Sequence, residues 1–184
     1  MSDFGFFGPI EFDTRILSTD KKESLKAKKC FWEVSEKQID KLRNAVGIYV
    51  FVIQHGTSWK PWYVGKTCSE KGFEGEIFQP HKIKVYTKLQ QKSGAYRFFF
   101  MPLLTKSGRI SKNTSTAKKE IEWLERRIIS IASLRNPDLE NVRDTKLQSK
   151  LFVPGVVGTR RVGRPQYDAK MARSVFFGEP FPDD

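Results

Sequence analysis

The chain has 184 residues and a mass of 21.3 kDa, a length that suits one domain with at most a short appendage. Hydrophobic residues make up 39% and aromatic residues 13% of it, which excludes a chain that is disordered throughout. No apolar run approaches the roughly 20 residues that span a bilayer, and the N-terminus lacks the basic and apolar stretches of a secretory signal. Two cysteines cannot form a disulfide framework, so the composition predicts a cytoplasmic protein without membrane contact.

The net charge of +12, from 33 Lys and Arg against 21 Asp and Glu, is the first indication of a partner. A small domain needs a net charge of only about 2–8 in magnitude to stay soluble. A larger basic excess attracts polyanions and releases their counterions on binding. The charge therefore favours nucleic acid as the partner, with a merely solubilising surface as the alternative.

Residues 1–40 are predicted to form an N-terminal arm and a short helix. The opening is aromatic and interrupted by Gly and Pro, which favours a loose arm, and the basic stretch from Lys21 to Lys29 favours the helix. The segment from Cys30 to Val34 has the composition of a short strand. A capping box that begins at Ser35 predicts a second helix, which ends at about Asn44.

Residues 41–145 are predicted to form the main domain. Val46 to Ile53 is β-branched and aromatic throughout, and after a polar loop Pro61 to Gly65 is predicted to pair with it antiparallel. The next segment, up to Leu89, has helical tendency but is broken by Pro80, which predicts two shorter helices. Ala95 to Leu104 is the third strand.

A basic loop and a long helix follow. Arg109 and Lys112 lie in the loop, which has no acidic residue, and they are predicted to contact nucleic acid. Asn136-Pro137-Asp138 ends the helix. Its apolar residues recur at steps of three and four: Ile121, Leu124, Ile128, Ile131 and Leu134.

These elements predict an α/β protein of the α+β type, with a small, mainly antiparallel central sheet flanked by helices. Beyond the main domain the character of the sequence changes, because glycines and prolines punctuate a basic tail. Residues 146–184 are therefore predicted to be a C-terminal extension that packs on the domain.

Two of the predicted strands each combine a tyrosine with a glycine, as Gly47-Ile48-Tyr49 and as Tyr63-Val64-Gly65-Lys66. Pairing of the strands would bring the two phenols close together on one face. Gly47 and Gly65 lack side chains, which would let a phosphate backbone approach them. Each feature alone is more typical of a buried tyrosine with a satisfied hydroxyl and of a bulge in a strand.

The two triplets, with thirteen residues between them, resemble those of the GIY-YIG nuclease family. Leu124 to Ile129 looks like the family's helix with its single metal-binding glutamate, here Glu125, and Asn141 looks like its closing polar residue. The resemblance covers roughly residues 41–143 and implies a GIY-YIG-like fold. It also implies an endonuclease that acts on DNA, double-stranded or branched.

The resemblance implies a role for each matched residue in the hydrolysis of a phosphodiester bond. Glu125 would bind Mg²⁺ or Mn²⁺ together with water and phosphate. Tyr49 would accept the proton of the attacking water, and Tyr63 would orient the water or the phosphate. Lys66 would lower the pKa of a tyrosine or offset the phosphate charge, and Asn141 would hold a tyrosine or the backbone in place.

The sequence departs from the family at one point, because no arginine occurs in residues 67–86, where the family has one that holds the phosphate. His81 and Lys82 follow Pro80, which favours their projection from a helix start toward the sheet in the place of that arginine. For His81 the alternative is a solvated surface histidine. Lysine supplies the charge of arginine but not its bidentate fork.

Two alternatives to the nuclease therefore stay open. One is a nucleic-acid-binding module of this fold with impaired catalysis, and the other is a structural or protein-interaction domain. For Glu125 the alternative is a residue at the rim of the core that pairs with a nearby Arg or Lys.

Overall fold

The structure is a computed structural model that describes residues 2–111, 117–141 and 175. Met1 to Glu140 form one compact unit, and Asn141 to Asp184 form a second. Lys112 and the predicted C-terminal extension, apart from residue 175, lie outside the described residues. Within the described ranges, no helix is both long and apolar enough to cross a bilayer.

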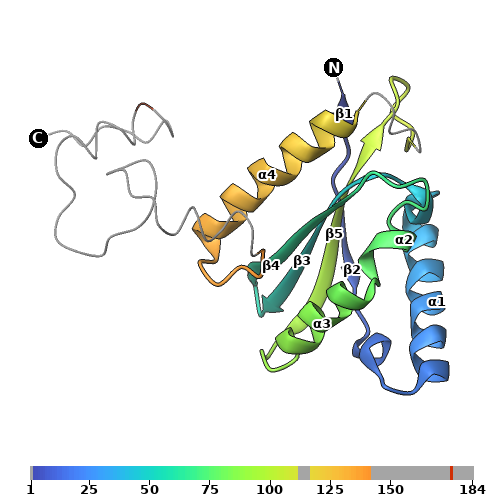
Figure 1. The fold of residues 1–184 in the computed structure, drawn as a ribbon, viewed down its shortest axis with the longest axis vertical. Helices are drawn as coiled ribbons and strands as arrows, with labels where there is room; N and C mark the ends of the chain where they lie inside the picture. The colour runs from blue at the N-terminus through green and yellow to red at the C-terminus, as the bar shows by residue number, and fades with distance from the viewer. Residues whose placement is uncertain (1, 112–116, 142–174, 176–184) are drawn as a thin grey trace, which may run out of the picture. The chain divides into compact units, whose positions relative to one another are not determined.

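The first unit is built on an antiparallel sheet of five strands (Figure 1). The strand order is β1-β5-β3-β4, and β2 also pairs with β5. Strand β4 therefore lies at an edge of the sheet. The bounds are β1 Asp3–Phe4, β2 Phe7–Glu11, β3 Gly47–His55, β4 Ser58–Thr67 and β5 Ala95–Leu104.

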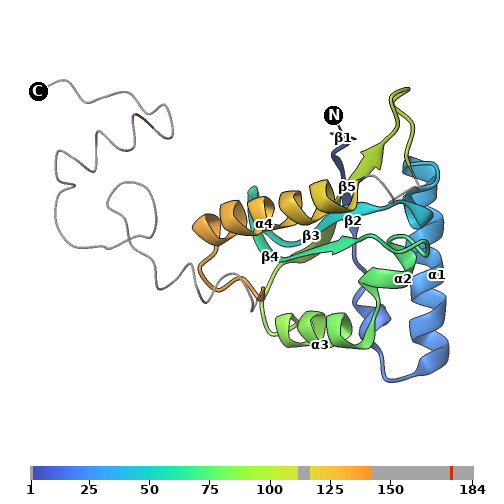
Figure 2. The same cartoon turned by 45° about the horizontal axis from the view of Figure 1, so that its top comes forward.

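Four α-helices of the described residues cover the sheet on its two faces. Helix α4 lies on one face, and α1, α2 and α3 lie on the other (Figure 2). This arrangement confirms the predicted α+β class, with a mainly antiparallel sheet flanked by helices. The bounds are α1 Lys21–Gln38, α2 Glu74–Ile77, α3 Pro80–Leu89 and α4 Lys118–Arg135, with 3₁₀ turns at Thr14–Leu17 and Leu42–Asn44.

The sheet separates two hydrophobic cores, because neighbouring residues of a strand point to opposite faces. Tyr49, Phe51 and Ile53 of β3 belong to the core under α1, α2 and α3. Ile48, Val50 and Val52 belong to the core under α4. Both faces of β3 are therefore buried, as its unbroken apolar sequence predicts.

The predictions for the middle of the chain are confirmed. All three predicted strands exist, although the first two pair farther along, up to a turn at Gly56. Pro80 occupies the first turn of α3 and separates it from α2. The predicted long helix is α4, and Asn136 follows its last residue. Its predicted apolar stripe is only partly correct, because Ile121 is buried whereas Ile131 and Leu134 are exposed.

The predictions for the N-terminal region are wrong in three respects. The opening is no loose arm, because β1 and β2 pair with β5. Cys30 to Val34 is no strand but part of α1, since Ala27, Phe31 and Ser35 recur at helical spacing and are buried. The hydroxyl of Ser35 donates to the Phe31 carbonyl at 2.6 Å and caps no second helix.

Candidate active site

The hairpin of β3 and β4 brings the two sequence triplets together. Tyr49 lies opposite Gly65, and Phe51 lies opposite Tyr63. The ring centroids of Tyr49 and Tyr63 are 6.2 Å apart, and both rings belong to the core on the α3 side. The prediction that the two phenols share one face is confirmed.

The two triplet glycines serve the packing of the hairpin. A Cβ at Gly65 would overlap the ring of Tyr49, so the missing side chain makes room for that ring. Gly47 has a φ of +147°, and a Cβ there would overlap the Met101 carbonyl of β5. Both glycines are buried and protein atoms fill the space beside each, which argues against the predicted approach of a phosphate backbone.

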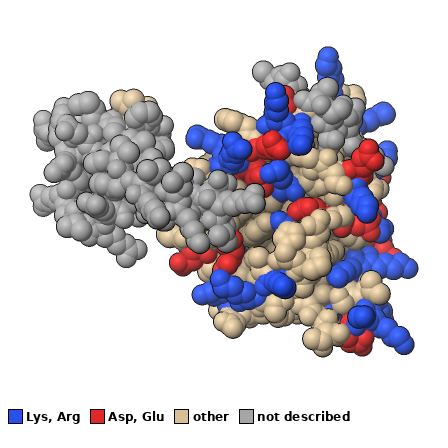
Figure 3. All heavy atoms as spheres, viewed as in Figure 1, with Lys and Arg blue, Asp and Glu red and all other residues tan. Residues whose placement is uncertain are grey.

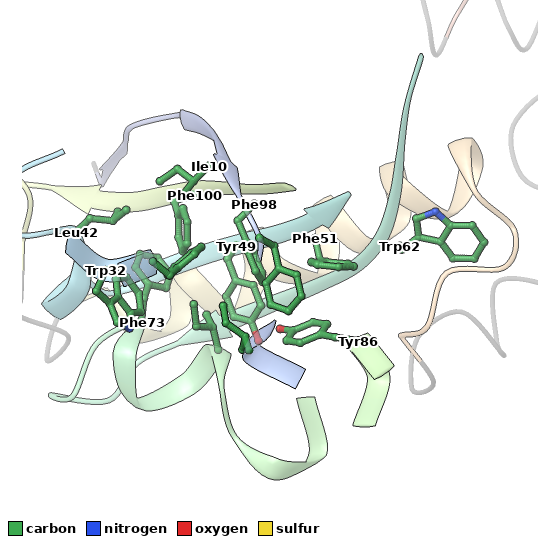
Figure 4. Close-up of a cluster of buried hydrophobic side chains, with 14 of the residues drawn as sticks. Ile10, Trp32, Leu42, Tyr49, Phe51, Trp62, Phe73, Tyr86, Phe98 and Phe100 are labelled. Carbon is green, nitrogen blue, oxygen red and sulfur yellow. The ribbon is translucent and has the colours of Figure 1, made fainter. Parts of the chain in front are cut away.

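A β-bulge in β4 shapes the strand beside Tyr63. The pairing shifts between Tyr63, opposite Phe51, and Pro61, opposite Val52, so that Trp62 has no partner on β3. A bulge turns side chains away from strict alternation. Trp62 and Tyr63 accordingly both lie on the α3 side, and Figure 4 shows Trp62 at one end of the aromatic cluster.

Helices α2 and α3 place charged groups against Tyr63. The Lys82 ammonium group donates a hydrogen bond to the Tyr63 hydroxyl and lies 4.6 Å from the centre of that ring. It also pairs with Glu76 Oε1 at 3.3 Å. Lys82 is only 7% exposed, whereas His81 is exposed, since consecutive residues of a helix point about 100° apart. Of the two candidates for the missing arginine, the structure brings Lys82 to the tyrosines.

Tyr49 faces a second buried phenol, Tyr86 of α3. Figure 4 shows the two hydroxyls pointing toward one another. Apart from the facing phenol, neither hydroxyl has a hydrogen-bond partner among the described residues. Burial raises the pKa of both phenols well above its ordinary value. Tyr49 therefore keeps its proton near neutral pH, which argues against its predicted role as the proton acceptor.

Lys66 and Glu125 form an ion pair on the opposite face of the sheet, between β4 and α4. Lys66 follows Gly65 directly, and the two residues point to opposite faces because strand residues alternate. Lys66 is thus turned away from the tyrosines, and the prediction that it acts on a tyrosine is wrong. Its side chain is 33% exposed and that of Glu125 is 17% exposed, so solvent reaches the pair.

The ion pair with Lys66 affects whether Glu125 is free to bind the predicted metal ion. Among the described residues, no group of three or more His, Cys, Asp or Glu gathers around a common point. One carboxylate suffices for Mg²⁺, which keeps several waters and takes further oxygens from a substrate phosphate. Partly exposed Glu125 fits this minimal requirement, and the ammonium group of Lys66 competes for the same carboxylate.

Asn136 is a further polar residue near the candidate site, and it was not among the site residues predicted from the sequence. It is fully buried, and its Nδ2 donates to the Pro61 carbonyl of β4 at 2.7 Å. Its Oδ1 accepts from the backbone N–H of Asp138 at 3.1 Å, as in an Asx turn. The sequence Asn-Pro-Asp was the signal that pointed to such a turn. Asn141 is buried and begins the second unit, so its role at the site stays a prediction.

On the face that Figure 3 shows, the basic side chains of the described residues are spread out rather than gathered in one stripe. Figure 3 shows Lys and Arg around the visible face of the first unit with acidic side chains among them. Arg109 is exposed in the turn after β5, where its carbonyl accepts from the Thr105 N–H at 2.7 Å. The exposed position of Arg109 is compatible with the predicted contact with nucleic acid, which stays a prediction.

Comparison of the chain with protein-family models, with curated proteins and with solved structures gave no match.

Proposed function

We propose that the chain is a cytoplasmic, metal-dependent endonuclease that hydrolyses DNA phosphodiester bonds at a GIY-YIG-type site on edge strand β4. One observation carries the proposal: β4 presents Tyr63 with Lys82 on one face and Lys66 with Glu125 on the other. A DNA strand that passes along this edge would meet both pairs. The two triplets on paired strands and the charge of +12 support the same reading.

The Tyr63 hydroxyl is the group that we expect to touch the phosphate or the attacking water. Its oxygen accepts the hydrogen bond from Lys82, so its own O–H is left to donate. Lys82 is buried and already engaged by Tyr63 and Glu76. It therefore acts as a positioning residue, and it supplies the positive charge that the family's arginine would supply. Tyr49 packs beside Tyr63 and fixes the position of the hairpin.

Glu125 is the residue that would hold Mg²⁺ or Mn²⁺. The ion would supply positive charge to offset the charge that develops on the phosphate. Lys66 would then be released from its pair with Glu125 and would be free to contact a neighbouring phosphate.

The test is an incubation of the full chain with supercoiled plasmid and with branched DNA, in Mg²⁺, in Mn²⁺ and in excess EDTA. We expect nicked or linear products with either metal and none with EDTA. A mock preparation from cells that lack the chain controls for contaminating nucleases. Intact DNA of every form in both metals would contradict the proposal.

A second candidate is a nucleic-acid-binding module of this fold that does not cleave. Two observations favour it: Lys66 occupies the carboxylate that a metal needs, and Tyr49 keeps its proton. Such a module would bind DNA in a salt-dependent manner and leave it intact. A structural or protein-interaction domain would not bind DNA even at low salt.

Replacing Lys82 by methionine is expected to slow cleavage by about 100- to 1,000-fold while the affinity for DNA changes little. Methionine keeps much of the apolar stem but removes the donor that fixes the Tyr63 hydroxyl, and loss of one preorganised donor typically has this effect. Cleavage rate at saturating DNA and binding in EDTA are measured side by side.

His81→Ala is the matched control, because the neighbouring side chain is exposed, and it should cleave at the parent rate. Thermal unfolding of Lys82→Met shows whether the unpaired Glu76 destabilises the fold. If it does, Glu76→Gln combined with Lys82→Met separates folding from catalysis. Equal cleavage by the folded variant and the parent would remove Lys82 from the site.

A further inference from the structure

The ammonium groups of two lysines lie over the indole ring of Trp62. Lys60 Nζ lies 4.8 Å and Lys92 Nζ lies 5.3 Å from the ring centre. Trp62 is only 5% exposed, so the ring is a fixed platform, and its Nε1 has no hydrogen-bond partner among the described residues. Two ammonium groups from separate parts of the chain thus converge on one rigid ring.

The backbone of both segments holds these lysines in place. The bulge in β4 turns Trp62 to the α3 side, and Lys60 lies on the same strand, opposite Ile53. Lys92 lies in the turn after α3. Its N–H donates to the Leu89 carbonyl at 2.9 Å, and its carbonyl accepts from the Tyr96 hydroxyl at 2.7 Å.

The charges of the two lysines are not offset by protein groups. In the part of the chain that the structure describes, neither lysine pairs with a carboxylate. Glu140 lies beside Trp62 at the edge of the sheet, since its N–H donates to the Trp62 carbonyl at 2.9 Å. Both of its carboxylate oxygens, however, are bound by Lys88 at 2.7 and 2.9 Å. Because neither ammonium group has a carboxylate partner, both charges attract an anion to the neighbourhood of this ring.

We propose that Lys60 and Lys92 bind a backbone phosphate of a nucleic acid strand that passes along β4. The inference rests on the proposed function and adds a second contact to it, on the same face as Tyr63. Because of the bulge at Trp62, Lys60 and Tyr63 lie opposite Ile53 and Phe51, which are two residues apart on β3, or about 7 Å along the sheet. Two nucleotides of B-form DNA cover about the same length along the helix axis. The subsite therefore holds the strand about two nucleotides from the reacting phosphate.

The test uses the full chain with the double substitution Lys60→Gln and Lys92→Gln. Affinity for a fluorescent duplex is measured in EDTA, where no cleavage occurs, at several salt concentrations. The two lysines share one phosphate, and loss of one phosphate contact lowers the magnitude of the slope of log affinity against log salt by about 0.9, which is the fall that we expect. Affinity at 0.1 M salt should fall by at least about tenfold.

The control is Lys22→Gln with Lys26→Gln, two exposed lysines of α1, which removes the same charge elsewhere. Should the double variant fail to fold, exposed Lys92→Gln alone should lower the slope by about half as much. DNA binding with an unchanged slope, or an equal fall in the control, would overturn the subsite and leave the proposed function standing. If the parent does not bind DNA, both proposals fail. If it binds with the expected slopes but never cleaves, the subsite stands and the nuclease does not.

Discussion

Replacement of Glu125 by glutamine is expected to reduce DNA cleavage by at least about 1,000-fold while the fold and the affinity for DNA are retained. Glutamine keeps the shape of the side chain and removes the charge that would bind the metal. The ion pair with Lys66 is lost as well, but solvent reaches both side chains, so the free energy of unfolding should fall by only about 0–1 kcal/mol. Cleavage rates at saturating metal and urea unfolding provide the two readouts.

Glu122→Gln is the matched control, because it makes the same change one turn earlier on α4 and should leave cleavage at the parent rate. If Glu125→Gln cleaves like the parent, any catalytic metal is bound elsewhere. If it unfolds instead, Glu125 is the structural partner of Lys66 and no metal ligand.

Gly47→Ala is expected to destabilise the protein by about 3–5 kcal/mol, which is a large part of the stability of a domain of this size. The new Cβ would overlap the Met101 carbonyl, a backbone atom held in the sheet, and the φ of +147° is a conformation that alanine rarely adopts. Overpacking and backbone strain each typically cost about 1–3 kcal/mol. Urea denaturation of the variant and the parent gives the difference.

Gly108→Ala controls for backbone strain alone. Gly108 also has a positive φ, of +74°, but a Cβ there would meet nothing within 4 Å. It should lose about 1 kcal/mol, as a single strained residue does. An equal loss at both glycines would mean that β3 and β5 shift to accommodate the extra atom.

Local sequence patterns sufficed to predict the middle of the fold. β3 and β5 have dense runs of β-branched and aromatic residues, and α4 has apolar residues at helical spacing. The N-terminal strands gave no such signal, because β1 and β2 are short and pair with β5, which lies about ninety residues away. Phe31 and Trp32 are adjacent, which is compatible with a strand as well as with the buried side of a long helix.

The sequence predicts the placement of the candidate site residues only where the alternation of strand residues determines the face on which they lie. Alternation places Tyr49 and Tyr63 on one face and Lys66 on the other. The resemblance to the family had instead implied that Lys66 acts on a tyrosine. Whether Lys82 or His81 faces the tyrosines depends on the rotation of α3 about its own axis. That rotation follows from how the helix packs on the rest of the domain. The bulge at Trp62 arises from the register of two strands, and no local pattern in the sequence indicates it.

The contacts of the segment after α4 also occupy backbone groups at the edge of the sheet. An exposed edge strand offers free backbone groups on which another chain can add a strand and start an aggregate. On β4, the carbonyls of Pro61 and Trp62 are already occupied by Asn136 and Glu140, and Pro61 has no N–H to offer. The stretch of the edge beside Tyr63 is therefore closed to a second copy of the chain, so the sheet cannot extend from one molecule to the next at this point.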